Sequence, residues 1–578
     1  MKRILSTIFS SGLCMFAMAI PAKPGFVAYT QPDGSVINVK IVGDEHGHMI
    51  YSAEGNLLIE SDGRLEYARF DAKGFPTASG IVATKENDSK IASMQIQPKE
   101  NVDKWASMMT ANRDSRLEKL YSKSAIKKAS TRAEESENRL VPYNFGRCDV
   151  TYPVLGEQKG LVILVSYQDL DFKYGDYDYF NRMLNEEGFS DYGSLGSARD
   201  WFVYNSNGQF LPDFDVYGPV VLPNDREYYG GNDAYGNDNR PEEMAIDACR
   251  LLDDEIDFTK YDRDGDGVVD NVFIFYAGKG EHDSGIKNTV WPHSWDLSLA
   301  RPDEEYVFDG VKLDHYACTC EYPSGYKRPD GIGTFVHEFS HVMGLPDLYV
   351  TTYTTGFTPG EWSVMDQGPY NNDRLTPPNY SSYEKCALGW LEFKPFEKGR
   401  MELTDLSTTN VAYALPTDSE NEFYFFENRQ QHGNDEFLPG HGMLVWHVDF
   451  DEEMWRLNVV NNIATHQYVD LIEADNIKTK TTRNADAFPG PKNVTSFGFE
   501  TKPQLSSWSK ARLSYDLENI AESEDGIISF DALTSGENAL VGVEAADDSD
   551  NIYYDLSGRR VINPGKGIYI KNGKKVVF

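Results

Sequence analysis

The pattern of apolar and polar positions divides this chain of 578 residues into five parts. An apolar start is followed by short alternating runs, then by a mixture of apolar strand-like runs and amphipathic helices, and then by alternating runs again. This length is too great for one hydrophobic core, so several domains are expected. The predicted parts are a signal segment, a β-rich segment with a linker, a mixed domain, a β-sandwich and a small β tail: 1–22, 23–140, 141–395, 396–537 and 538–578.

The first 22 residues have the pattern of an export signal. Two basic residues precede an apolar run from Ile4 to Ile20. The run is too short and too weakly apolar for a membrane anchor, and no later segment approaches about 20 uninterrupted apolar residues. Small residues suited to signal cleavage stand at Ala17, Ala19 and Ala22. We therefore expect a protein that is secreted or exposed at the cell surface, with no membrane span.

Residues 23–140 change from short strands to a charged segment. Gly-containing pairs (DG, EG, KG) recur at near-regular spacing up to about residue 110, which predicts antiparallel hairpins. His46 and His48 lie on one face of a predicted strand. They could touch a metal, but without a third ligand nearby we interpret them as surface histidines. Residues 99–140 are charged and helix-prone, which predicts a linker that proteases can reach.

The segment 141–395 mixes strands and helices. Residues 159–169 form an apolar, β-branched run that predicts a buried strand. Helices are predicted over 193–210 and 241–254, the second because Pro241 and early acidic residues mark its start. The order strand, helix, helix, strand and a further helix near residue 337 predicts an α+β fold.

From about residue 396 alternation replaces helical periodicity, which predicts a β-sandwich extending to residue 537. The remaining residues, 538–578, end in the basic sequence KNGKKVVF, although the chain as a whole is acidic. Two interpretations stay open for this tail. It resembles the sorting-type tails of proteins from Bacteroidetes-like bacteria, which would engage a secretion machinery, and it also fits an ordinary terminal hairpin.

Charge and cysteine content narrow the class of protein. The chain has 55 basic and 91 acidic residues, a net charge of −36. Binding to nucleic acid or to an anionic membrane needs the opposite sign, so neither is an expected partner. We expect a monomer that binds cations.

Five cysteines remain after the signal, and an odd number argues against a disulfide scaffold. We expect them to be buried as small apolar side chains. They are Cys148, Cys249, Cys318, Cys320 and Cys386.

The strongest chemical signal is HEFSHVMGLPD, from His337 to Asp347. His337 and His341 are four residues apart, so on a helix both imidazoles share one face and can bind one metal ion. Glu338 is placed to act as a general base on a metal-bound water. Gly344 suits the positive-φ end of a helix.

Asp347 lies six residues past His341, where the turned chain can return a third ligand to the metal. A position beside the metal, supporting another ligand, is the alternative. Met365 stands in a turn flanked by Gly and Asp and would form an apolar floor under the ion. Tyr370 and Tyr383 are both candidates to donate to an oxyanion, and the sequence does not choose between them.

This combination resembles the immune inhibitor A-like peptidases, the M6 family. The HExxHxxGxxH pattern with a methionine turn is that of metzincins, here with Asp347 at the third position, between IGTFVHEFSHVMGLPDLY and PPNYSSYEKCALGWLE. The resemblance extends from the N-terminal segment to about residue 535. It implies a zincin-like catalytic domain over 141–395, a prosegment before it, and a secreted zinc endopeptidase that is made as a zymogen and acts on proteins or peptides.

A calcium site is predicted in DRDGDGVVD, just before a buried strand. The match is to positions 1, 3, 5, 7 and 9 of an EF-hand loop, but Phe273 at position 12 excludes a complete EF-hand. Four carboxylates in nine residues would repel one another without a cation, so we expect a structural Ca²⁺. The predicted ligands are Asp262, Asp264, Asp266, the carbonyl group of Val268, and Asp270.

Two functions are compatible with these signals. The first is a zinc endopeptidase in which His337, His341 and Asp347 hold the metal and Glu338 is the general base. The second is a non-catalytic, calcium-dependent adhesin or glycan-binding protein that uses the zinc helix as structure. Structural zinc sites usually have four protein ligands rich in cysteine. The three candidates here include no cysteine and stand beside a base, which favours the enzyme.

Overall fold

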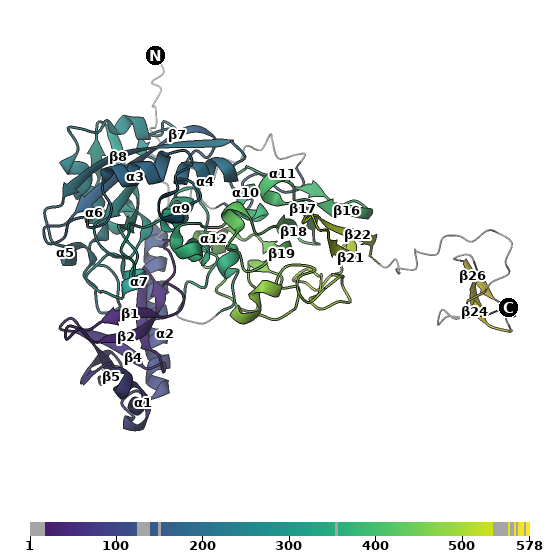
Figure 1. Ribbon diagram of the computed structural model, residues 1–578, viewed down its shortest axis with the longest axis horizontal. Helices are drawn as coiled ribbons and strands as arrows, with labels where there is room; N and C mark the ends of the chain where they lie inside the picture. The colour runs from purple at the N-terminus through teal and green to yellow at the C-terminus, as the bar shows by residue number, and fades with distance from the viewer. Residues whose placement is uncertain are drawn as a thin grey trace, which may run out of the picture.

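The structure is a computed structural model of the chain, and it combines helices with several sheets (Figure 1). The expected α+β class is confirmed. Among the described residues, no helix has the length and apolar character needed to cross a bilayer. Ala17, Cys148 and the segment 124–138 lie outside the described residues. The described ranges are 18–123, 139–147, 152–352, 356–535, 553–554, 560–561, 565–571 and 574–577.

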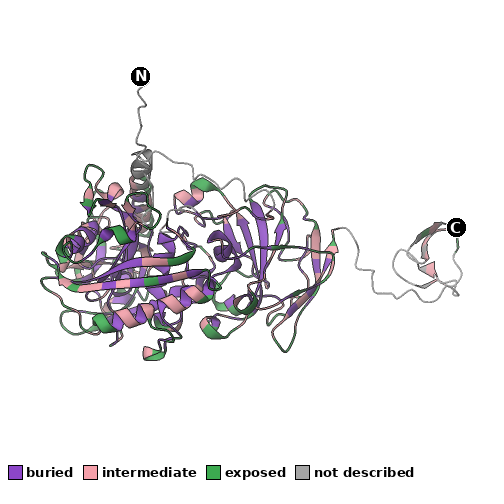
Figure 2. Cartoon of the chain, turned by 90° about the horizontal axis from the view of Figure 1, so that it is seen from above, coloured by how far each residue is buried: buried purple, intermediate pink, exposed green. Residues whose placement is uncertain are grey.

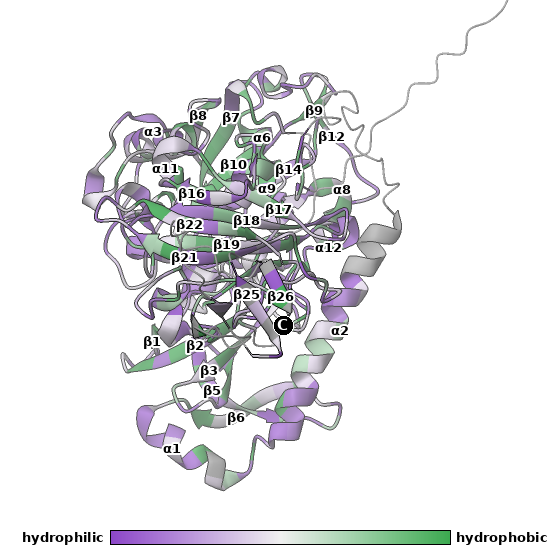
Figure 3. Ribbon diagram, turned by 90° about the vertical axis from the view of Figure 1, so that its right-hand side faces the viewer, coloured by the Kyte–Doolittle hydropathy of each residue, from purple (hydrophilic) through white to green (hydrophobic). Residues whose placement is uncertain are grey.

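The N-terminal part is a six-stranded antiparallel meander, paired in chain order, followed by two helices. The predicted hairpins are confirmed, because the glycines of the DG, EG and KG pairs adopt positive φ in the turns. Figure 3 shows hydrophilic residues along much of α2. The elements are β1 (Val27–Thr30), β2 (Val36–Asp44), β3 (Gly47–Ser52), β4 (Leu57–Ser61), β5 (Arg64–Phe70), β6 (Pro76–Val82), α1 (Lys85–Met94) and α2 (Lys99–Lys123).

The interpretation of His46 and His48 as surface histidines is wrong. His46 is 3% exposed, and the side chain of His48 is 6% exposed. The ring of His48 lies 5.4 Å from that of Trp291, which belongs to the mixed domain. Trp291 lies more than 200 positions from His48, so strand alternation alone does not reveal the surface that covers this histidine.

The mixed domain is built on a five-stranded sheet with the order β11-β14-β10-β7-β8. The strands β14, β10, β7 and β8 are parallel, and the edge strand β11 is antiparallel to β14. The predicted strand over 159–169 corresponds to β7, but β8 was missed, because its Asp and Pro residues interrupt the apolar pattern. The strands are β7 (Gly156–Ser166), β8 (Phe210–Val221), β10 (Val272–Tyr276), β11 (His293–Asp296) and β14 (His315–Cys320).

Helices cover both faces of this sheet. Val162 and Leu164 of β7 point to a core shared with α3, α4 and α9, whereas Leu161 and Ile163 point to a second core with α6. Figure 2 shows the buried residues concentrated in these layers. The helices are α3 (Tyr177–Asn185), α4 (Ala198–Asn205), α5 (Arg226–Gly230), α6 (Pro241–Leu251), α7 (Glu281–Ser284), α8 (Leu297–Ala300), α9 (Ile332–Val342) and α10 (Ser382–Ala387). A small sheet adds β9 (Val268–Val269), β12 (Tyr306–Phe308) and β13 (Val311–Leu313).

Two further sheets follow, ordered β15-β17-β18-β19-β20 and β16-β22-β21. They share an apolar core that includes Met401, Phe426 and Phe530. A separate four-stranded sheet, β24-β23-β25-β26, lies near the C-terminus. The elements are β15 (Lys394–Pro395), β16 (Gly399–Leu403), α11 (Leu406–Thr409), β17 (Tyr413–Pro416), β18 (Glu422–Arg429), β19 (Gly442–Asp449), α12 (Glu452–Arg456), β20 (Val469–Leu471), β21 (Tyr515–Glu522), β22 (Ile528–Thr534), β23 (Tyr553–Tyr554), β24 (Arg560–Val561), β25 (Ile568–Lys571) and β26 (Lys574–Val577).

Candidate metal centre

The helix α9 carries the HExxH residues and ends as the sequence predicts. Gly344 has φ of 93°, a value at which an L side chain would be strained. The amide of Gly344 donates to the carbonyl of His341, and the amide of Leu345 donates to the carbonyl of Ser340. This pair of bonds is a Schellman motif, which satisfies the last carbonyl groups of the helix and turns the chain back. The turn brings Asp347 beside the two histidines.

Three candidate ligand atoms form a small triangle. The Nε2 atoms of His337 and His341 are 3.1 Å apart, and Oδ1 of Asp347 lies 3.4 and 3.2 Å from them. Tetrahedral zinc with bonds of about 2.0–2.1 Å has ligand atoms about 3.3–3.4 Å apart. The three residues are buried, and Oδ1 of Asp347 has no hydrogen-bond donor among the described residues. The geometry and the donor set therefore fit one zinc ion.

Backbone carbonyls orient both imidazoles. Nδ1 of His337 bonds to the carbonyl of Val364 at 2.8 Å, and Nδ1 of His341 bonds to the carbonyl of Leu345 at 2.8 Å. With its proton on Nδ1, each ring presents the lone pair of Nε2 to the centre. Burial would raise the pKa of Asp347, but its electrostatic interactions with His341 and His337 outweigh this effect and lower the pKa below its usual value.

Asn458 holds the third candidate ligand. Its Nδ2 donates to Oδ2 of Asp347 at 2.6 Å, and its Oδ1 accepts from the amide of Asp347 at 2.8 Å. These bonds leave Oδ1 of Asp347 directed at the histidines. The sequence analysis missed Asn458, because it lies 111 residues further along the chain and no local pattern marks it.

Glu338 lies beside the triangle and is fully buried. One oxygen of its carboxylate and the ligand atoms of His337 and His341 lie within 4.8 Å of one another. Burial raises the pKa of Glu338 well above its usual range. Oε1 accepts from the amide of Ile20 at 2.8 Å, whereas Oε2 has no partner among the described residues. A carboxylate so placed can exchange a proton with a water at the centre.

Met365, which the sequence predicts as an apolar floor under the ion, is fully buried in the core of the mixed domain. Its carbonyl accepts from the amide of Leu348 at 2.8 Å, and its own amide donates to Oγ of Ser363 at 2.9 Å. The preceding residue, Val364, receives the hydrogen bond from His337. The turn therefore orients the candidate ligand His337 through Val364, and it holds Leu348, the residue after Asp347, through Met365.

The two candidate tyrosines have different surroundings. The hydroxyl of Tyr383 donates to the carbonyl of Gly146 at 3.1 Å and accepts from the indole of Trp455, inside the core. The hydroxyl of Tyr370 instead donates to the carbonyl of Pro21 at 2.6 Å, next to the segment that contacts Glu338. Tyr370 therefore lies beside the N-terminal segment at the candidate site, whereas Tyr383 is bound within the core.

The N-terminal segment Met18–Lys23 lies across the metal site. Met18 forms an antiparallel bridge with Ser294 of the edge strand β11, with amide-to-carbonyl distances of 3.0 and 2.7 Å. Two residues later, Ile20 meets Glu338. Three aromatic side chains donate to successive carbonyls of the segment: Tyr349 to Ala19, Trp291 to Ile20 and Tyr370 to Pro21. The backbone of this segment is therefore held by hydrogen bonds to β11, to Glu338 and to three aromatic side chains.

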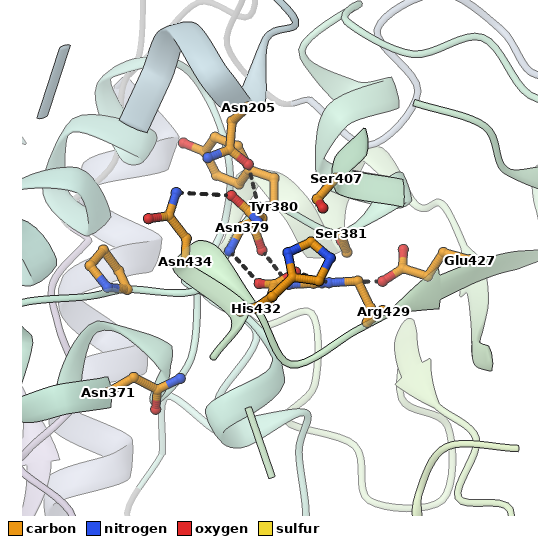
Figure 4. A network of polar contacts seen from close by, with 12 residues as sticks. Asn205, Asn371, Asn379, Tyr380, Ser381, Ser407, Glu427, Arg429, His432 and Asn434 are labelled. Atoms are coloured by element: carbon orange, nitrogen blue, oxygen red, sulfur yellow. Dashed lines mark hydrogen bonds and ion pairs between the residues drawn. The ribbon is translucent and has the colours of Figure 1, made fainter. Parts of the chain in front are cut away.

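A buried polar network joins the chain after Met365 to β18 (Figure 4). Arg429 donates to Asp435 at 2.6 and 2.8 Å and to the carbonyl of Asn379 at 2.9 Å. The next residue, Tyr380, shares a hydrogen bond with Ser340 of α9. Removing one partner of such a fully buried charge would be strongly destabilising. The C-terminal sheets are therefore structurally tied to the metal centre.

The acidic loop before β9 also brings its carboxylates together. Oxygens of Asp262, Asp264 and Asp266 lie within 4.8 Å of one another. Oδ1 of Asp262 is buried without a partner among the described residues, and Oδ2 of Asp270 accepts from the amide of Arg263 at 3.0 Å. Burial raises the pKa of Asp270 to about 8.

The cysteines that the structure describes are buried and form no disulfide bond, as the sequence analysis expected: Cys249, Cys318, Cys320 and Cys386.

Comparison with known proteins identifies the region around α9. Residues 164–388 match the family described as Immune inhibitor A peptidase M6, catalytic domain. Immune inhibitor A of Bacillus thuringiensis subsp. alesti is 26% identical over 275 residues, which cover 40% of this chain and 39% of that protein. The pre-pro-metalloprotease PrtV of Vibrio cholerae serotype O1 (strain M66-2) is 26% identical over 302 residues, covering 42% of this chain and 32% of that protein. The chain thus spans well under half the length of these relatives. The predicted resemblance is confirmed for residues 164–388, which contain the candidate metal centre; this range is narrower than the sequence patterns suggested.

Proposed function

We propose that this chain, whose residues 164–388 match an M6 catalytic domain, is a secreted zinc-dependent endopeptidase. The observation that carries the proposal is the triangle formed by His337, His341 and Asp347, with the buried carboxylate of Glu338 at its side. A structural zinc site would have no use for this base. The adhesin or glycan-binding alternative has no comparable support.

In this mechanism His337, His341 and Asp347 hold zinc, which supplies Lewis-acid polarisation of the peptide carbonyl and lowers the pKa of water. Glu338 accepts the proton of the attacking water and returns it to the leaving amine. Its raised pKa suits this exchange, because a carboxyl group of ordinary acidity would be a poor proton donor to the amine. Tyr370 donates to the oxyanion that develops on the substrate carbonyl.

The proposal includes a zymogen. Residues 20–23 begin with Ile20, whose amide bonds to Glu338, and they cover this base. Arg113 of α2 donates to Oγ1 of Thr351 at 2.7 Å, four residues past Asp347, so the segment 23–140 also packs beside the centre. Access to the metal therefore requires cleavage, for which the linker ending near residue 140 is the proposed place.

The wider organisation is proposed on the same basis. Residues 141–395 form a zincin-like catalytic domain, and 396–537 form a β-sandwich that supplies Asn458. The acidic loop from Asp262 to Asp270 holds a structural Ca²⁺ through Asp262, Asp264, Asp266, Asp270 and the carbonyl of Val268. The protein acts as a monomer on proteins or peptides. The tail 538–578 either engages a secretion machinery or is an ordinary terminal hairpin.

The test uses the purified full chain, before and after limited proteolysis, against a denatured protein and a mixed peptide library. We expect cleavage only after proteolysis, loss of cleavage on zinc chelation, and recovery with added zinc. A processed protein that holds one zinc ion per chain and cleaves none of these substrates would show the proposal to be wrong.

A further inference from the structure

The side chain of Lys23 reaches Tyr326, which lies in the chain between β14 and α9. Nζ of Lys23 is 5.5 Å from the centre of the Tyr326 ring, within the range of a cation–π contact. The amide of Lys23 donates to the carbonyl of His282 at 2.9 Å. Lys23 and Tyr326 are both half-buried. This residue of the N-terminal segment is thus held by its backbone and by its charged end.

Two buried carboxylates share one guanidinium group near this contact. Arg374 forms ion pairs with Asp283 and with Asp330, the latter at 2.9 Å. Each of the three side chains is 2% exposed or less. Oδ1 of Asp283 has no hydrogen-bond partner among the described residues. Because burial makes an unbalanced charge costly, this pair of carboxylates favours further positive charge nearby.

A third carboxylate and a second guanidinium group lie on either side of the Tyr326 ring system. The hydroxyl of Tyr326 donates to Oδ1 of Asp373, an exposed residue. The guanidinium carbon of Arg328 lies 5.1 Å from the centre of the Tyr326 ring, and its Nη2 donates to the carbonyl of Asp373 at 2.6 Å. Among the charged residues named here, carboxylates therefore outnumber guanidinium groups by three to two. The amine of Lys23 brings these charges into balance.

The electrostatics of Lys23 agree with this arrangement. Burial lowers the pKa of Lys23, and the charge of Arg374 lowers it further. The carboxylates of Asp283, Asp373 and Asp330 act in the opposite direction and favour the charged amine. Three acidic side chains thus hold a positive charge where a neutral side chain would gain nothing from them.

We propose that these residues form a subsite that binds a lysine or arginine side chain of a peptide substrate. The Lys23 subsite consists of Tyr326, Asp373, Arg328 and the ion-paired Asp283, Asp330 and Arg374. In the full chain Lys23 occupies the subsite, and removal of residues 20–23 leaves it free for a substrate. This inference rests on the proposed peptidase function.

The position of Ile20 shows which part of a substrate the subsite would bind. The amide nitrogen of Ile20 meets Glu338, the group proposed to return a proton to the leaving amine. Lys23 follows Ile20 by three residues. A substrate that runs in the same direction as this segment would therefore place the basic side chain after the cleaved bond. A cation–π contact changes a binding constant by about 3–30-fold.

The first test measures binding of three peptides to the processed protein by calorimetry: IPAKPG, which is residues 20–25, and its IPAAPG and IPAEPG versions. We expect IPAKPG to bind about 3–30-fold more tightly than IPAAPG, and IPAEPG to bind most weakly. Tyr326→Ala should remove this preference, whereas Tyr326→Phe keeps the ring and should retain it. Equal binding of the three peptides, or no binding of any, would overturn the proposal.

The second test measures the Tm of the full chain and needs no activity. Lys23→Met removes the charge but keeps a long side chain, and Asp373→Asn removes a carboxylate at a position whose φ is 54°. We expect the two changes in Tm to be non-additive, because each variant removes the same interaction. Lys23→Met combined with Asp303→Asn, which alters another exposed acid, is the control pair and should be additive. Additive effects in both pairs would contradict the contact.

Cleavage of a mixed peptide library separates this inference from the proposed function. We expect lysine and arginine to be enriched at one fixed position after the cleaved bond, and Tyr326→Ala to abolish the enrichment. Cleavage without that enrichment would overturn the subsite and leave the peptidase proposal intact. If nothing is cleaved although IPAKPG is preferred, the peptidase proposal fails while the recognition of a basic side chain stands.

Discussion

Asn458 binds Asp347 with both ends of its amide, accepting from the backbone at 2.8 Å and donating to Oδ2 at 2.6 Å. The two residues are 111 positions apart. One side chain from the C-terminal part thereby sets the direction of a candidate metal ligand. Partners of this kind commonly change metal affinity by about 10–100-fold.

Asn458→Ala should therefore weaken zinc binding by about 10–100-fold, because Asp347 loses the group that aims its Oδ1. Competition with a zinc chelator measures the change. Asn462→Ala is the matched control: Asn462 makes the same two kinds of bond, but with Thr351. Equal zinc affinity in the two variants would contradict the role given to Asn458.

Glu338→Ala should abolish proteolysis while zinc stays near one ion per chain, because Glu338 is proposed as the base and not as a ligand. General acid–base catalysis contributes about 10²–10⁴-fold. Turnover of the processed enzyme and elemental analysis provide the two measurements. Wild-type turnover would exclude the mechanism, and loss of zinc together with activity would make Glu338 a ligand.

Asp347→Ala should lower zinc affinity more than Asn458→Ala does, since it removes one of three proposed ligands outright. Zinc retained after dialysis decides this point. A variant that keeps its full zinc content would place Asp347 beside the metal and not on it.

The secreted zymogen should retain Ile20, with signal cleavage after Ala19 rather than after Ala22. Ala17 and Ala19 provide the small residues that such cleavage needs, and Ala19 and Ile20 are fully buried against the metal site. Intact-mass measurement of the secreted form gives its first residue. A zymogen that begins at Lys23 would lack the contact with Glu338, and the proposed occlusion by this segment would then be wrong.

Removal of calcium should lower the Tm of the wild type by several degrees. Asp264→Ala should lower the Tm by the part of this decrease that results from loss of calcium at the acidic loop. At one hundred times Kd, an ion bound only to the folded state stabilises it by about 2.7 kcal/mol. Asp254→Ala, which alters a nearby exposed acid, is the control. If calcium shifts the melting curves of wild type and Asp264→Ala equally, the acidic loop is a plain turn.

The local features of the centre were predictable because short-range geometry decides them. Helical periodicity places His337 and His341 on one face, and Gly344 ends the helix because a positive φ is easiest there. The hairpins before residue 83 followed from their glycine pairs in the same way. In each case the interacting residues lie within a few positions of one another.

Other features depend on which distant surfaces meet. His48 is buried against Trp291, and β8 forms because β7 offers a parallel edge despite the polar residues of β8. The different surroundings of Tyr370 and Tyr383 also depend on distant residues, Pro21 and Gly146. Alternation and propensity describe a strand but not the surface that it meets.

The sequence by itself determined the candidate chemistry of this protein: two imidazoles and a carboxylate proposed to bind a metal, a proposed base beside them, and a methionine turn, all within 29 consecutive positions, 337–365. Only the tertiary structure decided how the candidate ligand Asp347 is oriented and which residues cover Glu338. Ile20 meets Glu338 across 318 positions, and Asn458 meets Asp347 across 111. Such pairs form when separate elements pack into one core, and packing is a property of the whole fold that no local pattern contains.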